Sequence, residues 1–403
     1  MRTDAVAQGE RLVIAYTNVG HALVHAIEVT YGALLLRIQA DLGVTEAFMG
    51  AVASVFGWAF GATALPAGFL ADRWGPAKVL SFTFAGACGA CLLVATAASS
   101  WMLALGMALL GLATGFYHPA GTTLIAQGVR SRGVAMGYHG VAGNMGMGLA
   151  PAVAGVIATL WSWRGAYVAL AASAAALALW ASRLQVRPLA MWQEGRHQAG
   201  FGEPVGRLMV ALMAVYAGSV LMGMVYRGSM TFLPAHLHDK ASARFADSLT
   251  TLVLLIGAVG QYTGGILTRR VRLEWLALWV VAWALPPLLL MGLLEGGPMV
   301  AMAGAFIFWH FAHQPIFNTL IADYSPPALV GRSFGLVYLA AFGLGGAGGI
   351  IAGAMVDRWD TGAAFMGMAS LWALALLATL PLPFLVQRRA VSPKLAYIDP
   401  EDT

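Results

Sequence analysis

Long apolar runs separated by short polar loops dominate this chain of 403 residues. Most runs reach about 20 residues, the length that an α-helix needs to cross the hydrocarbon core of a bilayer. The pattern therefore predicts an all-α membrane protein with about twelve transmembrane helices. The expected spans are 12–37, 46–71, 79–98, 101–126, 133–160, 164–184, 207–235, 245–268, 273–294, 298–323, 329–356 and 361–386.

Composition excludes several classes of protein. With 59% hydrophobic residues, 10% charged residues and a mean hydropathy of +0.74, the chain lies outside the range of soluble globular domains. Lys and Arg stand singly or in twos and threes between apolar runs, so we expect no nucleic-acid binding. Because no loop combines a nucleophile with a base or carries a metal-binding motif, we expect neither an enzyme nor a bound cofactor.

Basic residues indicate the orientation of the chain in the membrane. Most of the 23 Lys and Arg residues fall in the N-terminal segment, the linker, the C-terminal segment and alternate loops. Cytoplasmic loops carry an excess of Lys and Arg, so both termini are expected in the cytoplasm. Residues 1–10 lack a signal-peptide cleavage site, so the first span should itself target the chain.

An internal repeat relates the two halves at an offset of 196 residues. Gly68 and Asp72 correspond to Gly264 and Thr268, and Pro119 corresponds to Pro315 in the same register. One offset that fits separate places predicts two pseudo-symmetric six-helix bundles with a substrate site between them near the membrane midplane. The expected units are an N-terminal bundle at 1–184, a cytoplasmic linker at 185–206, and a C-terminal bundle with a cytoplasmic tail at 207–403.

The loop after the second span has a specific order of glycines and charges. It reads Gly-Phe-Leu-Ala-Asp-Arg-Trp-Gly-Pro-Ala-Lys over 68–78, and charge is tolerated there only at a membrane boundary. The spacing resembles the signature loop between helices 2 and 3 of the major facilitator superfamily, with Pro76 and Ala77 as departures. The resemblance implies that Asp72 faces the start of helix 11 and helps to latch the two halves. The expected latch residues are Gly68, Asp72, Arg73, Gly75, Lys78 and Arg332.

Small residues recur along the fifth span at Gly137, Gly146, Pro151 and Gly155. Such residues let helices approach closely, and a proline bends a helix. The pattern resembles the helix 5 motif of antiporters in this superfamily, with alanine at two of its glycine positions. It implies close contact with the other half and transport by exchange. The glycine run 343–349 in the eleventh span is interpreted as close packing rather than as a phosphate-binding loop.

Polar side chains inside the spans are the candidates for substrate binding and proton coupling, because burying them is costly. His21, His25 and Glu28 share one helix face, and histidine changes charge near neutral pH. In the superfamily, helices 1, 4, 7 and 10 line the cavity, which implies that most of these residues face it. The candidates are His21, His25, Glu28, Tyr117, His118, Asn144, Arg227, His310, His313, Gln314 and Asn318.

Three of the polar residues have alternative interpretations. Glu28, the only carboxylate well inside a span, could pair with Arg227 in a structural ion pair. Arg227 could instead reach the outer surface with its long side chain. His139 is interpreted as an interfacial histidine with a structural role.

A narrower resemblance comes from the first and fourth spans. Gly20-His21-x3-His25, Asp41-Leu-Gly-Val and Phe116-Tyr-His-Pro-Ala-Gly121 are similar to the fosmidomycin-resistance branch of the superfamily. The resemblance implies a proton-driven exporter of a small anionic or zwitterionic compound, needing a proton gradient, a lipid bilayer and no cofactor. We expect a monomer in a bacterial inner (plasma) membrane. The alternatives are an uptake symporter for a carboxylate-type metabolite and a transition-metal transporter.

No metal site is expected from the sequence. Cys88 and Cys91 lie three apart in an apolar span, where small residues at a helix contact are commoner than a soft-metal pair. The 19 methionines are interpreted as flexible apolar packing, with a copper path as the alternative.

Overall fold

The computed structural model describes residues 2–44, 46–184, 205–242 and 245–386. The described residues form helices and connecting turns, with no strand among them. Most of the predicted linker at 185–206 and the tail from residue 387 lie outside the described residues.

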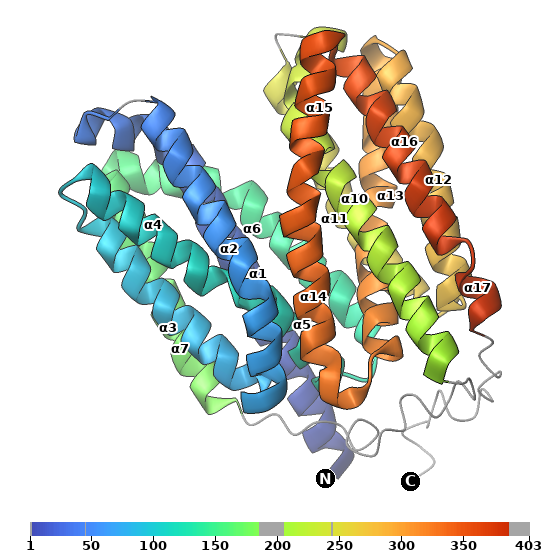
Figure 1. Cartoon of the computed structure of the whole chain (residues 1–403). Coiled ribbons are helices and arrows are strands. Elements are labelled where there is room, and N and C mark those ends of the chain that lie inside the picture. Colours follow the sequence, from blue (N-terminus) through green and yellow to red (C-terminus); the bar gives the residue numbers. More distant parts are fainter. Residues whose placement is uncertain (1, 45, 185–204, 243–244, 387–403) are drawn as a thin grey trace.

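Seven helices form the N-terminal bundle, and the remaining helices form the C-terminal bundle (Figure 1). The first bundle contains α1 (Arg2–Leu42), α2 (Glu46–Trp74), α3 (Pro76–Ala95), α4 (Ser100–Gly115), α5 (Tyr117–Gly128), α6 (Arg132–Leu160) and α7 (Trp163–Arg183). The second contains α10 (Val205–Lys240), α11 (Ala246–Leu267), α12 (Leu273–Leu293), α13 (Gly296–Tyr324), η1 (Pro327–Leu329), α14 (Val330–Gly343), η2 (Leu344–Gly346), α15 (Ala347–Arg358), α16 (Thr361–Thr379) and α17 (Leu382–Leu385).

These elements correspond to the predicted spans, and the fold class is confirmed. Within the described ranges, ten segments are long and apolar enough to cross a membrane, one of them formed by α4 and α5 together. The helices α2 and α13 also have the length of a span, but they are not among those ten. Polar residues such as His310, Gln314 and Asp323 lower the mean hydropathy of α13.

Two predicted spans are interrupted in the structure. The fourth is divided at Phe116 into α4 and α5, and the eleventh passes through the 3₁₀ turn η2 between α14 and α15. The glycines at this second break lie directly against α10. A methyl group at Gly348 would be 1.9 Å from the carbonyl oxygen of Met224, and one at Gly345 would be 3.1 Å from the backbone of Gly223. The close-packing interpretation is confirmed for these two glycines of the run.

The turn between α2 and α3 is set by two adjacent residues. Gly75 has φ of +86°, a conformation that side chains disfavour, and Pro76 follows as the first residue of α3. The polar segment 68–78, predicted to be a loop, is therefore the end of α2, the single turn residue Gly75 and the first turn of α3.

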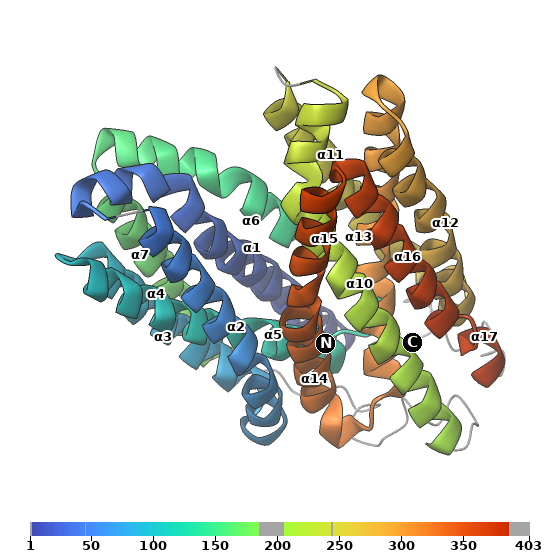
Figure 2. The same cartoon turned by 45° about the horizontal axis from the view of Figure 1, so that its top comes forward.

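The two bundles lie close together at one end and diverge toward the other (Figures 1 and 2). We call the end at which Gly68 of α2 contacts Gly331 of α14 the latch end. A methyl group at Gly68 would be 2.2 Å from the Gly331 carbonyl oxygen, so the two backbones are in direct contact there. A second contact joins the bundles, because a methyl group at Gly137 of α6 would be 2.9 Å from Gly265 Cα of α11.

The motif in α6 only partly faces the other bundle. Gly137 does so, as predicted, but Gly146 packs on α1 of its own bundle, where an added methyl would lie 2.2 Å from the Ala22 carbonyl oxygen. The prediction for Gly146 was wrong because Gly137 and Gly146 are nine residues, or two and a half turns, apart and lie on opposite faces of α6. Gly155 has open space around it, and the side chain of Pro151 lies outside the described residues.

Candidate functional site

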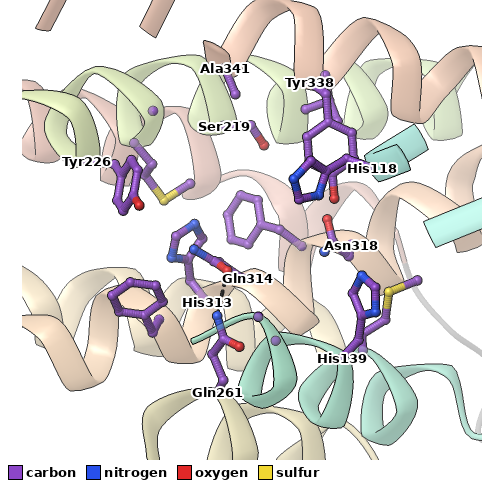
Figure 3. A pocket seen from close by; sticks show the side chains of 18 of the residues that line it. His118, His139, Ser219, Tyr226, Gln261, His313, Gln314, Asn318, Tyr338 and Ala341 are labelled. Carbon is purple, nitrogen blue, oxygen red and sulfur yellow. Dashed lines mark hydrogen bonds between the residues drawn. The ribbon is translucent and has the colours of Figure 1, made fainter. Parts of the chain in front are cut away.

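A cavity of about 180 Å³ lies between the bundles and is lined by α1, α5, α6, α10, α11, α13 and α14 (Figure 3). Its position between pseudo-symmetric halves is the one that the repeat predicted. Nine of the predicted candidates line it, namely His21, His25, His118, Asn144, Arg227, His310, His313, Gln314 and Asn318.

Four histidines of the N-terminal bundle form one cluster. The rings of His21 and His139 stack with centroids 3.9 Å apart and an interplanar angle of 3°. The Nε2 atoms of His21 and His25 are 3.1 Å apart, and the ring of His118 lies 5.1 Å and 5.3 Å from these two rings. Helices α1, α5 and α6 thus bring together residues that are far apart in sequence.

The remaining two candidates of this bundle are not among the residues that line the cavity. Glu28 accepts a hydrogen bond from Nδ1 of His25 at 2.9 Å, and its side chain is 38% exposed. Tyr117 is buried, stacks on His21 and donates its hydroxyl to the carbonyl of Thr17. Both act on the cavity through a histidine rather than by lining it.

The C-terminal bundle contributes a second polar group from α13. His310 stacks on Tyr226 of α10 with centroids 5.5 Å apart, and its ring is 5.0 Å from that of His313. One turn further along α13, Gln314 accepts a hydrogen bond of 2.8 Å from Nε2 of Gln261 in α11.

The cavity is basic. Arg227 of α10 is the only Lys or Arg among its described lining residues, and no Asp or Glu is among them. Arg227 and Glu28 interact electrostatically, as the ion-pair alternative anticipated, but Glu28 hydrogen-bonds to His25. The side chain of Arg227 is exposed and lines the cavity, as its place among the candidates predicted.

Several residues of the cavity wall were missed by sequence reasoning, among them His139 and Gln261. His139 was interpreted as an interfacial residue, which was wrong, because its ring is buried against His21. Gln261 was not named. A methyl group at Gly140 of α6 would lie 1.5 Å from Oε1 of Gln261, so this side chain crosses from one bundle onto the other. Gln261 could have been found from the sequence, because it is a polar residue inside an apolar span.

A second buried carboxylate lies at the end of a span. Glu28 was predicted to be the only one well inside a span, and the structure adds Glu274, the second residue of α12, which is fully buried. It accepts a hydrogen bond from the hydroxyl of Tyr324 at 2.9 Å and pairs with Arg272 at 3.1 Å. This group ties α12 to the end of α13 and lies outside the cavity lining.

Asp72 lies at the start of α14, where the resemblance placed it. Its Oδ1 accepts from the backbone N–H of Gly331 at 2.6 Å, and its Oδ2 accepts from that of Arg332 at 2.9 Å. The carboxylate therefore caps the positive end of a helix from the other bundle. Arg73 at the end of α2 and Lys78 at the start of α3 are exposed.

The sequence profile of the Major Facilitator Superfamily matches residues 18–347. The chain belongs to this superfamily. Its members are transporters of small molecules rather than enzymes, and they draw energy from ion gradients without a bound cofactor. This major facilitator protein is 27% identical over 269 residues to a probable sulfoacetate transporter, SauU, from Cupriavidus necator, and that match spans 62% of each chain. It is 23% identical over 368 residues to the fosmidomycin resistance protein of Escherichia coli, covering 86% of each.

Solved structures agree with the fold of this major facilitator protein. The transporter FucP in its outward conformation gives a TM-score of 0.74 at 14% identity, covering 94% of this chain and all of that one. The human organic anion transporter MFSD10 gives a TM-score of 0.72 at 18% identity, covering 92% of this chain and 99% of that one. At these identities the likeness establishes the fold alone.

Proposed function

We propose that this protein is a proton-driven exporter of a small organic anion. The observation that carries the proposal is the charge of the cavity: Arg227 and six histidines line it, and the described lining includes no carboxylate. A guanidinium stays protonated in proteins, so the cavity keeps a positive charge that an anionic cargo offsets. A cation would meet repulsion in a space where like charges cost far more than in water.

Similar proteins support an anionic cargo. The relatives include the probable sulfoacetate transporter and a probable L-galactonate transporter of Escherichia coli, 24% identical over 261 residues, and both names specify an anion. The likeness to the fosmidomycin resistance protein and the small-residue pattern of α6 favour export. Uptake by symport is the alternative direction, because the names of the first two relatives specify no direction.

Alternating access supplies the mechanism. The bundles diverge away from the latch end, which is the arrangement of one access state (Figure 1). Closing that side and separating the latch would expose the same cavity to the other face of the membrane. The cargo site then stays fixed between the bundles while they rock around it.

The test is transport by purified protein in proteoliposomes with an imposed pH gradient. The panel contains sulfoacetate, L-galactonate and fosmidomycin as anions, L-fucose as a neutral solute, and a lipophilic cation. We expect an anion to collapse the gradient, followed with an internal pH dye, and to move opposite to the protons. Movement of anion and protons in the same direction would show symport. Transport of the lipophilic cation in place of the anions would contradict the proposed cargo class.

A further inference from the structure

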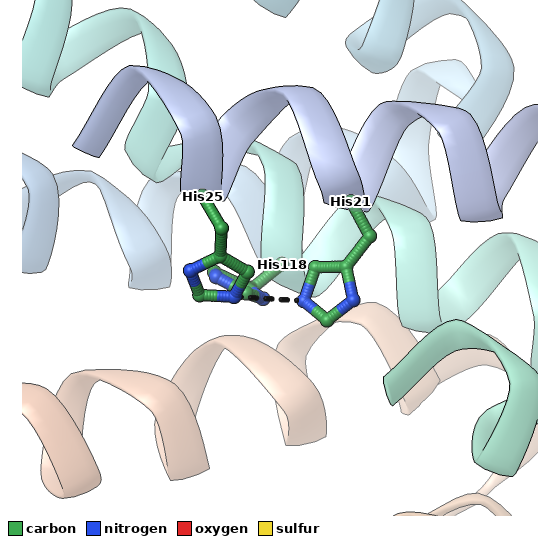
Figure 4. Close-up of side chains that lie close together, drawn as sticks. All are labelled: His21, His25 and His118. Atoms are coloured by element: carbon green, nitrogen blue, oxygen red, sulfur yellow. Dashed lines mark hydrogen bonds between the residues drawn. The ribbon is translucent and has the colours of Figure 1, made fainter. Parts of the chain in front are cut away.

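Three histidine side chains from two helices converge on one point of the cavity wall. His21 and His25 come from α1 and His118 from α5, and each offers a ring nitrogen such that all three lie within 4.8 Å of one another (Figure 4). His21 and His118 are buried, and His25 is partly buried. No other group of this kind is found in the described part of the chain.

Hydrogen bonds fix the protonation pattern of two of these rings. Nδ1 of His21 is 2.6 Å from the carbonyl oxygen of His139, and a carbonyl only accepts, so this nitrogen carries the hydrogen. Nδ1 of His25 is 2.9 Å from the carboxylate of Glu28 and is fixed in the same way. Each neutral ring then presents a lone pair at Nε2.

These two lone pairs face each other. The Nε2 atoms of His21 and His25 are 3.1 Å apart, which is hydrogen-bond distance, but neither neutral ring has a hydrogen to place between them. Two lone pairs at this distance repel unless a cation lies between them. The cation is either a shared proton or a metal ion.

The third histidine distinguishes these two cations. A shared proton bridges two nitrogen atoms, whereas His118 places a third nitrogen near the pair. Within the described residues, no protein group hydrogen-bonds to the buried Nε2 of His118. We propose that His21, His25 and His118 form a binding site for a divalent transition-metal ion of the zinc and cobalt type. Because all three side chains line the cavity, the open fourth position faces the cavity interior.

The geometry suits such an ion. Ligands at about 2.0–2.1 Å from a tetrahedral zinc ion are roughly 3.4 Å from one another. The pair of Nε2 atoms at 3.1 Å is already near this spacing, and His118 needs a shift of roughly 1 Å to reach it. Imidazole nitrogen is a preferred ligand of zinc, cobalt, nickel and copper ions.

The surroundings hold the rings as metal sites require. Ligand histidines usually donate their second nitrogen to a carboxylate or a carbonyl, and Glu28 and the carbonyl of His139 serve His25 and His21 in this way. Gly143 of α6 leaves room for both rings, because an added methyl would lie 2.6 Å from His21 and 3.0 Å from His25. The inference goes beyond the proposed function, since neither anion transport nor proton coupling requires a metal.

Cobalt binding to the full-length protein in detergent tests the site directly. The purified protein, stripped with a chelator, is titrated with Co²⁺ and followed by visible absorption, and bound Co²⁺ is then displaced with Zn²⁺. We expect one Co²⁺ per chain with the intense absorption of four-coordinate cobalt. The measurement needs no cargo and no gradient, so its outcome is independent of the proposed function.

Variants identify the ligands. His21→Ala and His118→Ala should weaken Co²⁺ binding by more than about 100-fold, and Glu28→Gln, which removes the negative charge of the group that holds His25, by about 10–100-fold. His118→Cys should retain binding and add a sulfur-to-cobalt charge-transfer band in the near ultraviolet, which only direct ligation gives. His313→Ala is the matched control, because His313 is a buried histidine of the same cavity outside the trio.

The named outcomes decide the proposal. Saturable binding in the wild type and in His313→Ala, its loss in His21→Ala, and the new band in His118→Cys would support it. Absence of saturable Co²⁺ or Zn²⁺ binding to folded wild-type protein would overturn it and leave a shared proton between His21 and His25. Binding that survives in the double variant His21→Ala/His118→Ala, checked for folding by circular dichroism, would also overturn it.

Discussion

Arg132 and Asp323 form an ion pair of 2.6 Å between the two bundles. Arg132 begins α6 in the N-terminal bundle and Asp323 lies in the last turn of α13 in the C-terminal bundle, and their side chains are 7% and 14% exposed. A pair that is this buried must break before the bundles can separate at this point. It therefore stabilises the state in which the latch end is closed.

Removing one partner of this pair should favour opening of the latch end. Loss of one partner of a buried pair costs about 3–5 kcal/mol, so Asp323→Asn should shift the equilibrium toward the open state by at least about 100-fold. The measurement is the alkylation rate of a cysteine placed at Ile321, a cavity-lining position on α13, in a protein without Cys88 and Cys91. The rate should rise in the variant.

An exposed pair provides the matched control. Arg130 and Glu10 also lie 2.6 Å apart, but both belong to the N-terminal half and Arg130 is exposed, so Glu10→Gln should leave the alkylation rate unchanged. The charge reversal Arg132→Asp with Asp323→Arg should restore most of the protection. Equal rates in wild type and Asp323→Asn would show that the pair does not hold the bundles closed.

Much of the fold could be predicted from sequence because one physical quantity governs it. The length of each apolar run is set by bilayer thickness, so the spans and their order follow from hydropathy. The cavity histidines on the candidate list were also predictable. A histidine such as His118 or His310 in an apolar span is costly to bury, so a purely structural role explains it less often than in a soluble protein.

Pairings between helices could not be predicted in the same way. Arg132 and Asp323 lie at helix ends, where charged residues are ordinary, and nothing in the pattern links positions 191 residues apart. His139 was misinterpreted for a related reason: a position near the end of an expected span does not specify the side to which its ring points. Only the packing of α6 on α1 brings it onto His21.

Removal of the Asp72 carboxylate should slow transport. This carboxylate caps α14 through two backbone N–H groups, and losing a helix cap costs about 0.5–2 kcal/mol. This loss destabilises only the state in which the latch end is closed. We expect Asp72→Ala to lower the transport rate about 2- to 30-fold at normal expression. Lys78→Gln, an exposed change in the first turn of α3, should keep the wild-type rate. An unchanged rate in Asp72→Ala would exclude the latch role.

Gly140→Ala should reproduce the effect of losing the Gln261 side chain. The added methyl would lie 1.5 Å from Oε1 of Gln261 and displace it from Gln314. A neutral hydrogen bond contributes about 0.5–1.5 kcal/mol, so the half-saturating cargo concentration should change about 2- to 10-fold in Gly140→Ala and in Gln261→Ala alike. The double variant should add nothing further.

Gly148→Ala is the control for that pair of variants, because it lies on the same helix with open space around it. It should leave the half-saturating concentration unchanged. Additive effects of Gly140→Ala and Gln261→Ala would mean that the glycine acts through another neighbour.

Asp41 should make a stability contribution that depends on pH. The Arg164 guanidinium, bound at 2.6 Å, lowers the pKa of this carboxyl, which lies at the end of α1 beyond its apolar stretch. A lowered folded pKa means stability that is present above the unfolded value of about 3.9 and is lost as pH falls further. Because the pair is exposed, Asp41→Asn should cost only about 0.2–1 kcal/mol at pH 7.

Thermal unfolding in detergent, followed by circular dichroism, measures this difference. The melting temperatures of wild type and Asp41→Asn should differ at neutral pH and converge as the pH is lowered below about 3.9. A difference that persists at low pH would mean that the asparagine disturbs packing instead of removing an ion pair.

Arg227 should determine charge selectivity. Its fixed charge is the only one among the described lining residues, and a charge-assisted hydrogen bond contributes about 1.5–3 kcal/mol. Arg227→Ala should therefore raise the half-saturating concentration of an anionic cargo about 10- to 100-fold in proteoliposomes. Arg227→Lys should restore it only in part, because lysine lacks the bidentate fork. Arg358→Ala, which removes an exposed charge at the end of α15, should have little effect. Equal losses for an anionic and a neutral analogue would assign Arg227 a structural role, since a selectivity residue must distinguish the two.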